Sequence, residues 1–255
     1  MDKSIVRLSQ AFLVIFIISI PLGLYGVKYR TVISNSSFFQ AMNSIFVTDY
    51  GVLWLSGAFW SHTLCICLPE KFQSRILINR LLKYTLYLIF GVFFNAWFFG
   101  PSLVERLNVA TGGHCAGSEE LLQSMSQCRG NPLSSWVDGF DLSGHYFFLI
   151  TSSSVLLDAI SRRNAGAGTG ANSNEQNCHK SMAQKLLQMA TTLTTRFAMV
   201  LITVWLVEFC VTSIFFHTVW EKASGLLGIP VGLMILALSD KICGIKVAQE
   251  QYSAV

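Results

Sequence analysis

Charged residues are scarce in this chain. Asp, Glu, Lys and Arg make up 13% of its 255 residues, which is about half of their share in a typical soluble domain. Apolar residues make up 52%, with 19 Phe and 6 Trp, and the mean hydropathy is +0.51. This composition argues against a soluble globular enzyme and predicts an integral membrane protein. The net charge of +4 is modest and needs no nucleic-acid partner to explain it.

Several motifs of known catalytic chemistry are also missing. The sequence contains no HExxH zinc motif, no glycine-rich phosphate loop and no GxSxG nucleophile elbow. It has no internal repeat, so an inverted-repeat transporter gains no support. Any chemistry must therefore come from residues outside these motifs.

Six segments meet, or nearly meet, the requirement of roughly 20 mostly apolar residues for crossing a bilayer. They cover about residues 10–27, 48–68, 84–100, 140–160, 197–216 and 223–240. The first ends in GLYGVKYR rather than at a small-residue cleavage site, so we expect a retained anchor and not a signal peptide. We predict an all-α, polytopic membrane protein in which residues 1–255 form a single domain of six transmembrane helices.

The distribution of Lys and Arg predicts the orientation. With both termini in the cytosol, 13 of the 18 basic residues fall on the cytosolic side. The other five are Lys28, Arg30, Arg106, Arg129 and Lys222. Since cytosolic loops carry an excess of basic residues, we expect both termini to face the cytosol.

Three connecting segments have distinct compositions. The lumenal loop 101–139 holds Cys115 and Cys128, which we predict to form a disulfide because the compartment would be oxidising. The cytosolic loop 161–190 contains NAGAGTGANSNEQN and is predicted to be a flexible linker. The basic segment PEKFQSRILINRLLK could be an amphipathic helix on the cytosolic leaflet or simply the beginning of the third span. The sequon at Asn35 is a test of topology.

Two histidines are placed near the lumenal ends of neighbouring spans. His145 lies about five residues inside the fourth span, in GFDLSGHYFFL, and His217 closes the fifth span, in SIFFHTVWEK. Each has an acid four residues away, Asp141 and Glu221, and residues i and i+4 share a helix face. Each acid could therefore hold its imidazole in one tautomer. The pairing of His217 with Glu221 requires the helix to continue, and Asp141 or Ser143 could instead cap the fourth helix.

A single buried histidine is often only a structural polar residue, but two at one depth favour a functional site. A zinc site usually has three or four protein ligands, and two histidines are too few to form one. We therefore expect no metal and no cofactor. Ser143 is a weak candidate nucleophile, because the nearby His145 points elsewhere on a helix. Two imidazoles do suit phosphoryl transfer, in which one attacks phosphorus and the other protonates the leaving oxygen.

The segments GFDLSGHYFFL and FFHTVWEK resemble the two signature segments of the fat-storage-inducing transmembrane (FIT) family, in its fungal branch. Such proteins are similar to lipid phosphate phosphatases, which use an SGH segment and a second histidine motif. The resemblance implies that His217 is the nucleophile and His145 the acid. Lipid phosphatases place an arginine six residues before the second histidine, where this chain has Val211, and their further Lys/Arg motif is missing. Phosphate must therefore be held differently.

The same resemblance implies a fatty acyl-CoA diphosphatase of the endoplasmic reticulum membrane, with its active site facing the lumen. The products would be an acyl phosphopantetheine and adenosine 3′,5′-bisphosphate. It also implies a role in lipid-droplet formation and lipid homeostasis, with membrane lipids, acyl-CoA and neutral lipids as partners. Phe147, Phe148 and Leu149 match the family's apolar triplet, where an acyl chain could lie, although they could equally form a lipid-facing helix surface. The alternative function is a non-catalytic protein that binds triacylglycerol or diacylglycerol. The oligomeric state is open.

Overall fold

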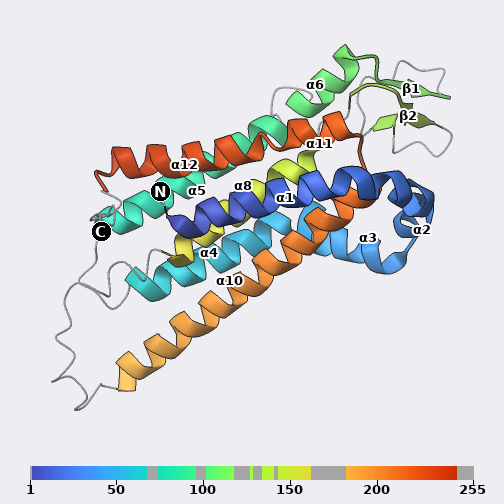
Figure 1. Ribbon diagram of the computed structural model, residues 1–255. Coiled ribbons are helices and arrows are strands. Elements are labelled where there is room, and N and C mark those ends of the chain that lie inside the picture. The colour runs from blue at the N-terminus through green and yellow to red at the C-terminus, as the bar shows by residue number, and fades with distance from the viewer. Residues whose placement is uncertain are drawn as a thin grey trace, which may run out of the picture.

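The chain folds into a bundle of long helices, seen here in a computed structural model (Figure 1). The structure describes residues 2–67, 74–95, 102–117, 127–128, 134–140, 143–161 and 182–245. The long helices are α1 (Lys3–Gly26), α4 (Gly51–Cys67), α5 (Ser74–Asn95), α8 (Gly144–Ser161), α10 (Met182–Phe215) and α12 (Gly228–Ile242). Each predicted span overlaps one of them.

Length and composition qualify three stretches of the described residues as membrane-crossing helices. They are Lys3–Ser34, Gln184–Phe215 and Val219–Ile242, and the apolar helix Gly51–Cys67 is shorter. Helices α5 and α8 carry buried ionic residues, Lys83 and Asp158 among them. The protein is thus a mostly helical membrane protein, and the count of six spans and the cytosolic termini stay predictions.

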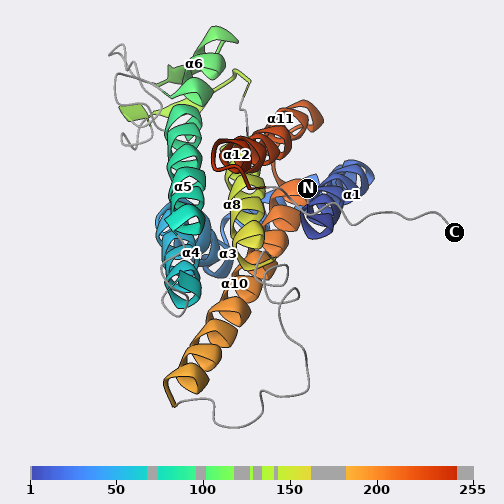
Figure 2. The ribbon, with the colours of Figure 1, turned by 90° about the vertical axis from the view of Figure 1, so that its left-hand side faces the viewer.

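Helix α8 lies at the centre of the bundle. It packs against α1, α4, α5, α10 and α12, and Figure 2 shows it between α4 and α5 on one side and α1 on the other. Its sequence TSSSV supplies small side chains that are buried among its neighbours. On α12, Gly228 and Gly232 lie on one face, where an added Cβ of Gly228 would meet the Phe147 backbone at 3.2 Å. Small residues at this spacing let two helices approach closely.

Shorter elements gather at one end of the bundle, opposite the start of α1 and the end of α12 (Figure 1). They are η1 (Val27–Tyr29), α2 (Arg30–Ser34), α3 (Ser37–Asn43), η2 (Ser44–Thr48), α6 (Leu103–Ala110), β1 (His114–Ala116), β2 (Ser135–Val137) and α11 (Val219–Gly225). Strands β1 and β2 pair antiparallel, with Cys115 opposite Trp136. The expected all-α fold therefore contains one small two-stranded sheet.

At the other end, buried ionic side chains join three helices. Lys83 Nζ of α5 lies 2.6 Å from Asp158 Oδ2 of α8 and 3.0 Å from Asp240 Oδ1 of α12. Arg80 Nη1 lies 3.5 Å from Asp158 Oδ2 and its Nη2 donates to the Ala159 carbonyl at 2.7 Å. From Ser74 onward the basic segment is part of α5, which turns these two bases inward. Residues 68–73 lie outside the described residues.

Part of the predicted flexible linker 161–190 is helical. Residues 162–181 lie outside the described residues, whereas α10 already begins at Met182. Residues 182–190 are therefore helical. At 34 residues and 1.5 Å per residue, α10 is about 50 Å long, which exceeds the roughly 30 Å hydrocarbon core of a bilayer.

Candidate active site

Close packing of α11 and α12 against α8 brings the two histidine segments together. A Cβ added to Gly225 would lie 2.5 Å from Tyr146 Cβ, and one added to Gly228 would lie 3.1 Å from Ile150 Cβ. The Tyr146 hydroxyl also donates to Ser213 Oγ of α10. Since Tyr146 follows His145 directly, the start of α8 is fixed beside the turn that carries His217.

His217 lies in a turn between two helices. Helix α10 ends at Phe215 and α11 begins at Val219, and His217 adopts a φ of 59°. Such left-handed backbone is uncommon outside glycine, although His and Asp adopt it more readily than most residues, and it recurs at functional sites. Among the described non-glycine residues, Asp138 is the other with positive φ.

The pairing of His217 with Glu221 is made, but not on a continuous helix. Thr218 and Glu221 form a capping box at the start of α11, in which the Thr218 backbone N–H donates to Glu221 Oε2 at 2.7 Å. The same Oε2 lies 3.7 Å from His217 Nδ1. The pairing therefore does not require the helix to continue, because the chain turns at His217 and the capping geometry of α11 brings the Glu221 carboxylate back to the imidazole.

His145 has a partner that the sequence did not suggest. Its Nε2 lies 3.0 Å from Asn43 Oδ1, at the end of α3. His217 is a charged neighbour that acts electrostatically on the His145 ring. His145 is not among the residues that line the pocket beside His217.

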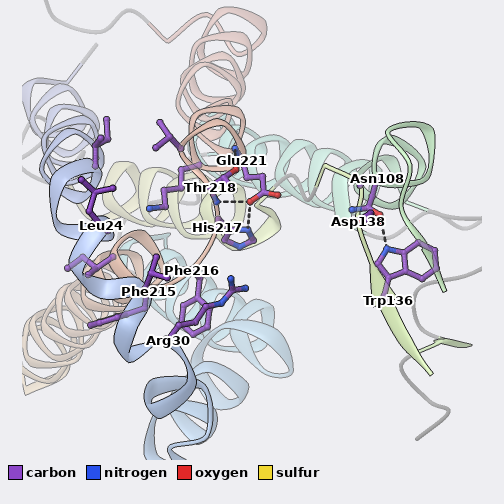
Figure 3. A pocket seen from close by; sticks show the side chains of 17 residues that line it. Leu24, Arg30, Asn108, Trp136, Asp138, Phe215, Phe216, His217, Thr218 and Glu221 are labelled. Atoms are coloured by element: carbon purple, nitrogen blue, oxygen red, sulfur yellow. Dashed lines mark hydrogen bonds and ion pairs between the residues drawn. The ribbon is translucent and has the colours of Figure 1, made fainter. Parts of the chain in front are cut away.

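A pocket of about 660 Å³ lies against His217 (Figure 3). One wall is apolar and is formed by α1 and the end of α10, with Ile20, Leu24 and Ile214. The other wall is polar and comes from the segment 101–139, with Asn108 and Asp138. The size falls within the range of small-molecule sites, roughly 300–1,000 Å³. The pocket can therefore receive a molecule with one polar and one apolar part.

The polar wall is held by a compact folded segment. Asn108 is buried, and its Oδ1 accepts a hydrogen bond from Trp136 Nε1 at 2.7 Å. The Phe140 backbone N–H donates to Thr111 Oγ1 at 2.6 Å. Cys115 and Cys128 form a disulfide with a Cα–Cα distance of 5.8 Å, which ties β1 to the loop. The described residues of this segment are thus held together beside the pocket by hydrogen bonds and a disulfide.

The remaining predicted residues take other places. Ser143 is buried and its Oγ accepts from the Tyr146 backbone N–H at 3.3 Å, so it caps α8. Asp141 lies outside the described residues. Phe147 and Leu149 are buried within the bundle, whereas Phe148 is half-buried and packs against Trp205 with ring centroids 5.7 Å apart. Two of the three triplet side chains therefore face protein rather than lipid.

Two basic side chains line the pocket. Arg30 is exposed, and its guanidinium lies 5.9 Å from the centre of the Phe216 ring. Lys222 is buried, and its ammonium donates to the Ser213 carbonyl. Lys28 and Arg106 do not line the pocket, and Arg129 lies outside the described residues. Within the described part of the chain, no group of three or more His, Cys, Asp or Glu side chains is placed to hold a metal ion.

Comparison with known proteins confirms the family that the sequence resembles. The profile of the fat storage-inducing transmembrane protein family matches residues 36–237. The chain belongs to this family. It is 26% identical over 236 residues to acyl-coenzyme A diphosphatase fit1 of Schizosaccharomyces pombe, covering 88% of this chain and 83% of that protein. No solved structure matches the chain.

Within this member of the fat storage-inducing transmembrane family, sequence reasoning missed Asn43 and could not rank the bases. Asn43 is 102 residues from His145, in a segment expected to be a plain connection. Arg30 was one of five non-cytosolic bases with nothing to distinguish it. Only the folded chain shows that these residues lie beside the histidines.

Proposed function

We propose that this protein is a fatty acyl-CoA diphosphatase that cleaves the phosphoanhydride of acyl-CoA to acyl phosphopantetheine and adenosine 3′,5′-bisphosphate. The observation that carries the proposal is the His217–Glu221 pair in a pocket with an apolar and a polar wall. Family membership and the name of the fission yeast relative support it. The endoplasmic reticulum membrane, a lumen-facing site, and a role in lipid-droplet formation and lipid homeostasis belong to the same proposal.

In the proposed first step, His217 attacks one phosphorus of the diphosphate. Because Nδ1 faces Glu221, Nε2 carries the lone pair that forms the new P–N bond. The bond from phosphorus to the bridging oxygen breaks, and that oxygen keeps the bonding electron pair. It accepts a proton from His145. The carboxylate of Glu221 stabilises the positive charge that develops on the His217 ring.

In the second step, water attacks the same phosphorus. His145, now neutral, accepts the proton of this water, and the P–N bond breaks to return His217. Proton transfer by a positioned group contributes about 10²–10⁴-fold to a rate. Asn43 would fix which nitrogen of His145 carries the proton, since its side-chain oxygen accepts from Nε2.

The test is hydrolysis of a long-chain acyl-CoA by the purified full-length protein. We expect release of adenosine 3′,5′-bisphosphate by the wild type, and a loss of at least about 100-fold for His145→Ala, the low end of general acid–base contributions. His217→Ala should abolish turnover. His114→Ala is the matched control, because His114 is exposed on β1 and does not line the pocket. Full turnover in both His145→Ala and His217→Ala would refute the catalytic assignment.

Neutral-lipid binding without catalysis makes a different prediction. It requires binding of diacylglycerol or triacylglycerol to survive the loss of both histidines. Phe148 is the member of the triplet to probe, because polar substitution of the buried Phe147 or Leu149 would disturb packing first. Binding that Phe148→Ser abolishes, in a protein with no acyl-CoA turnover, would favour this alternative.

A further inference from the structure

Arg30 is positioned to contact a ligand beside His217. It is the first residue of α2 and lines the pocket that contains His217. Its guanidinium lies over the ring of Phe216, the residue directly before His217. Figure 3 shows Arg30 and His217 facing the same opening, with the Phe216 ring beneath the guanidinium. The stacked ring restricts the arginine while leaving its edge free to donate hydrogen bonds.

The guanidinium of Arg30 has no anionic partner among the described residues. None of the ion pairs found there includes it. Glu221, which also lines the pocket, is already engaged by the Thr218 backbone and by His217. A guanidinium presents a planar set of donors that matches two oxygens of a phosphate. An unpaired arginine on the wall of a pocket is therefore suited to an anionic ligand.

The second cation of the pocket has a different task. Lys222 is 3% exposed and its Nζ donates to the Ser213 carbonyl, near the end of α10. Carbonyls in the last turn of a helix have no helical partner, and a lysine commonly satisfies them. Lys222 thus fastens the α10–α11 turn. Of the two cations, Arg30 is the one that remains open to a ligand.

We propose that Arg30 binds the diphosphate of the substrate next to His217. Lipid phosphatases carry an arginine six residues before the second histidine, a position that Val211 occupies here. In this chain α2 supplies a guanidinium from a distant part of the sequence instead. This inference rests on the proposed function for the identity of the substrate, but not for the presence of a phosphate contact.

The first experiment measures kcat and KM for a long-chain acyl-CoA with purified Arg30→Gln and Lys28→Gln. Lys28 is the matched control, because it is an exposed base of η1 that does not line the pocket and loses the same charge. We expect Arg30→Gln to lower kcat/KM by about 10- to 100-fold, the range for losing a hydrogen bond to a charged group. Lys28→Gln should stay within about twofold, as expected of a screened surface charge. Equal effects of the two variants would overturn the proposal.

Two further variants test whether Arg30 acts through the paired donors of its guanidinium or only through its positive charge. Arg30→Lys should recover only part of the activity, since lysine keeps the charge but not the paired donors. Phe216→Leu removes the ring under the guanidinium and should raise KM more than it lowers kcat. Full recovery by Arg30→Lys, combined with no effect of Phe216→Leu, would contradict the geometry proposed here.

A binding experiment separates this inference from the proposed function. Thermal shifts are measured with inorganic pyrophosphate and with adenosine 3′,5′-bisphosphate, neither of which requires turnover. If the wild type hydrolyses no acyl-CoA, the proposed function fails. Stabilisation by pyrophosphate that Arg30→Gln loses and Lys28→Gln keeps would still support Arg30 as a phosphate contact. Stabilisation retained by both variants, or absent from the wild type, would refute it.

Discussion

At the scale of single residues, Glu221 has two roles, one in capping α11 and one beside His217. A substitution can separate these two roles. The Glu221 carboxylate caps α11 through the Thr218 backbone and also faces His217 Nδ1. Glutamine is accepted in a capping box but carries no charge. Glu221→Gln should therefore fold normally and lose about 10- to 100-fold in kcat, as is typical when a group that orients a functional histidine is changed.

Thr218→Ala is the converse experiment at the same scale. It removes the hydroxyl that accepts from the Glu221 backbone N–H and should lower stability by about 1 kcal/mol, the usual cost of losing a helix cap. Thermal unfolding in detergent and steady-state kinetics measure the two effects side by side. If Glu221→Gln lowers stability as much as Thr218→Ala and leaves kcat unchanged, the carboxylate has only a structural role.

At the scale of elements, the approach of α11 and α12 to α8 sets the distance between the two histidines. Gly225→Ala would place a Cβ 2.5 Å from Tyr146 Cβ, so α11 must move away from α8. We expect a lower melting temperature together with a loss of acyl-CoA hydrolysis. Gly57→Ala in α4 is the control, because an added Cβ there meets no atom within 4 Å and alanine favours a helix by about 1 kcal/mol. Normal activity of Gly225→Ala would show that the α8–α11 contact does not position the site.

The sequence predicted the helices better than it predicted the contacts between them. Long apolar runs predict the long helices well, because burial in a bilayer demands such runs over a whole helix. The gap between the spans predicted at 197–216 and 223–240 indicates a turn near His217, but nothing in FFHTVWEK predicts the positive φ that His217 adopts there. The inward-facing bases Arg80 and Lys83 were counted as cytosolic charges, because their acidic partners lie 75 or more residues away. Asn43 and Arg30 meet the histidines only through such distant contacts.

On the scale of the whole molecule, the buried ionic cluster holds three helices together at the end away from the site. Removing one partner of a buried pair leaves an uncompensated charge and costs about 3–5 kcal/mol. Asp158→Asn leaves Lys83 and Arg80 without this carboxylate and should lower the melting temperature strongly. His145 is 13 residues from Asp158, or about 20 Å along α8, so the kcat of the folded fraction should stay normal.

The control for this prediction removes charge in a balanced way. Lys83→Met combined with Asp158→Leu takes away one cation and one anion, and should cost less stability than Asp158→Asn alone. Fluorescence-detected size exclusion after heating measures all three proteins. A double variant that is less stable than the single one would show that the cluster is needed as a set of hydrogen bonds rather than for charge balance.

The central claim is that His217 forms a covalent bond to phosphorus during turnover. It can be tested by mixing the wild-type protein with a long-chain acyl-CoA, stopping the reaction in alkali within milliseconds, and analysing the His217 peptide by mass spectrometry. We predict a transient mass increase on His217 that matches one phosphorylated half of the substrate and decays as product forms. Full turnover with no adduct on His217, in a protein whose His217→Ala variant is equally active, would contradict the account.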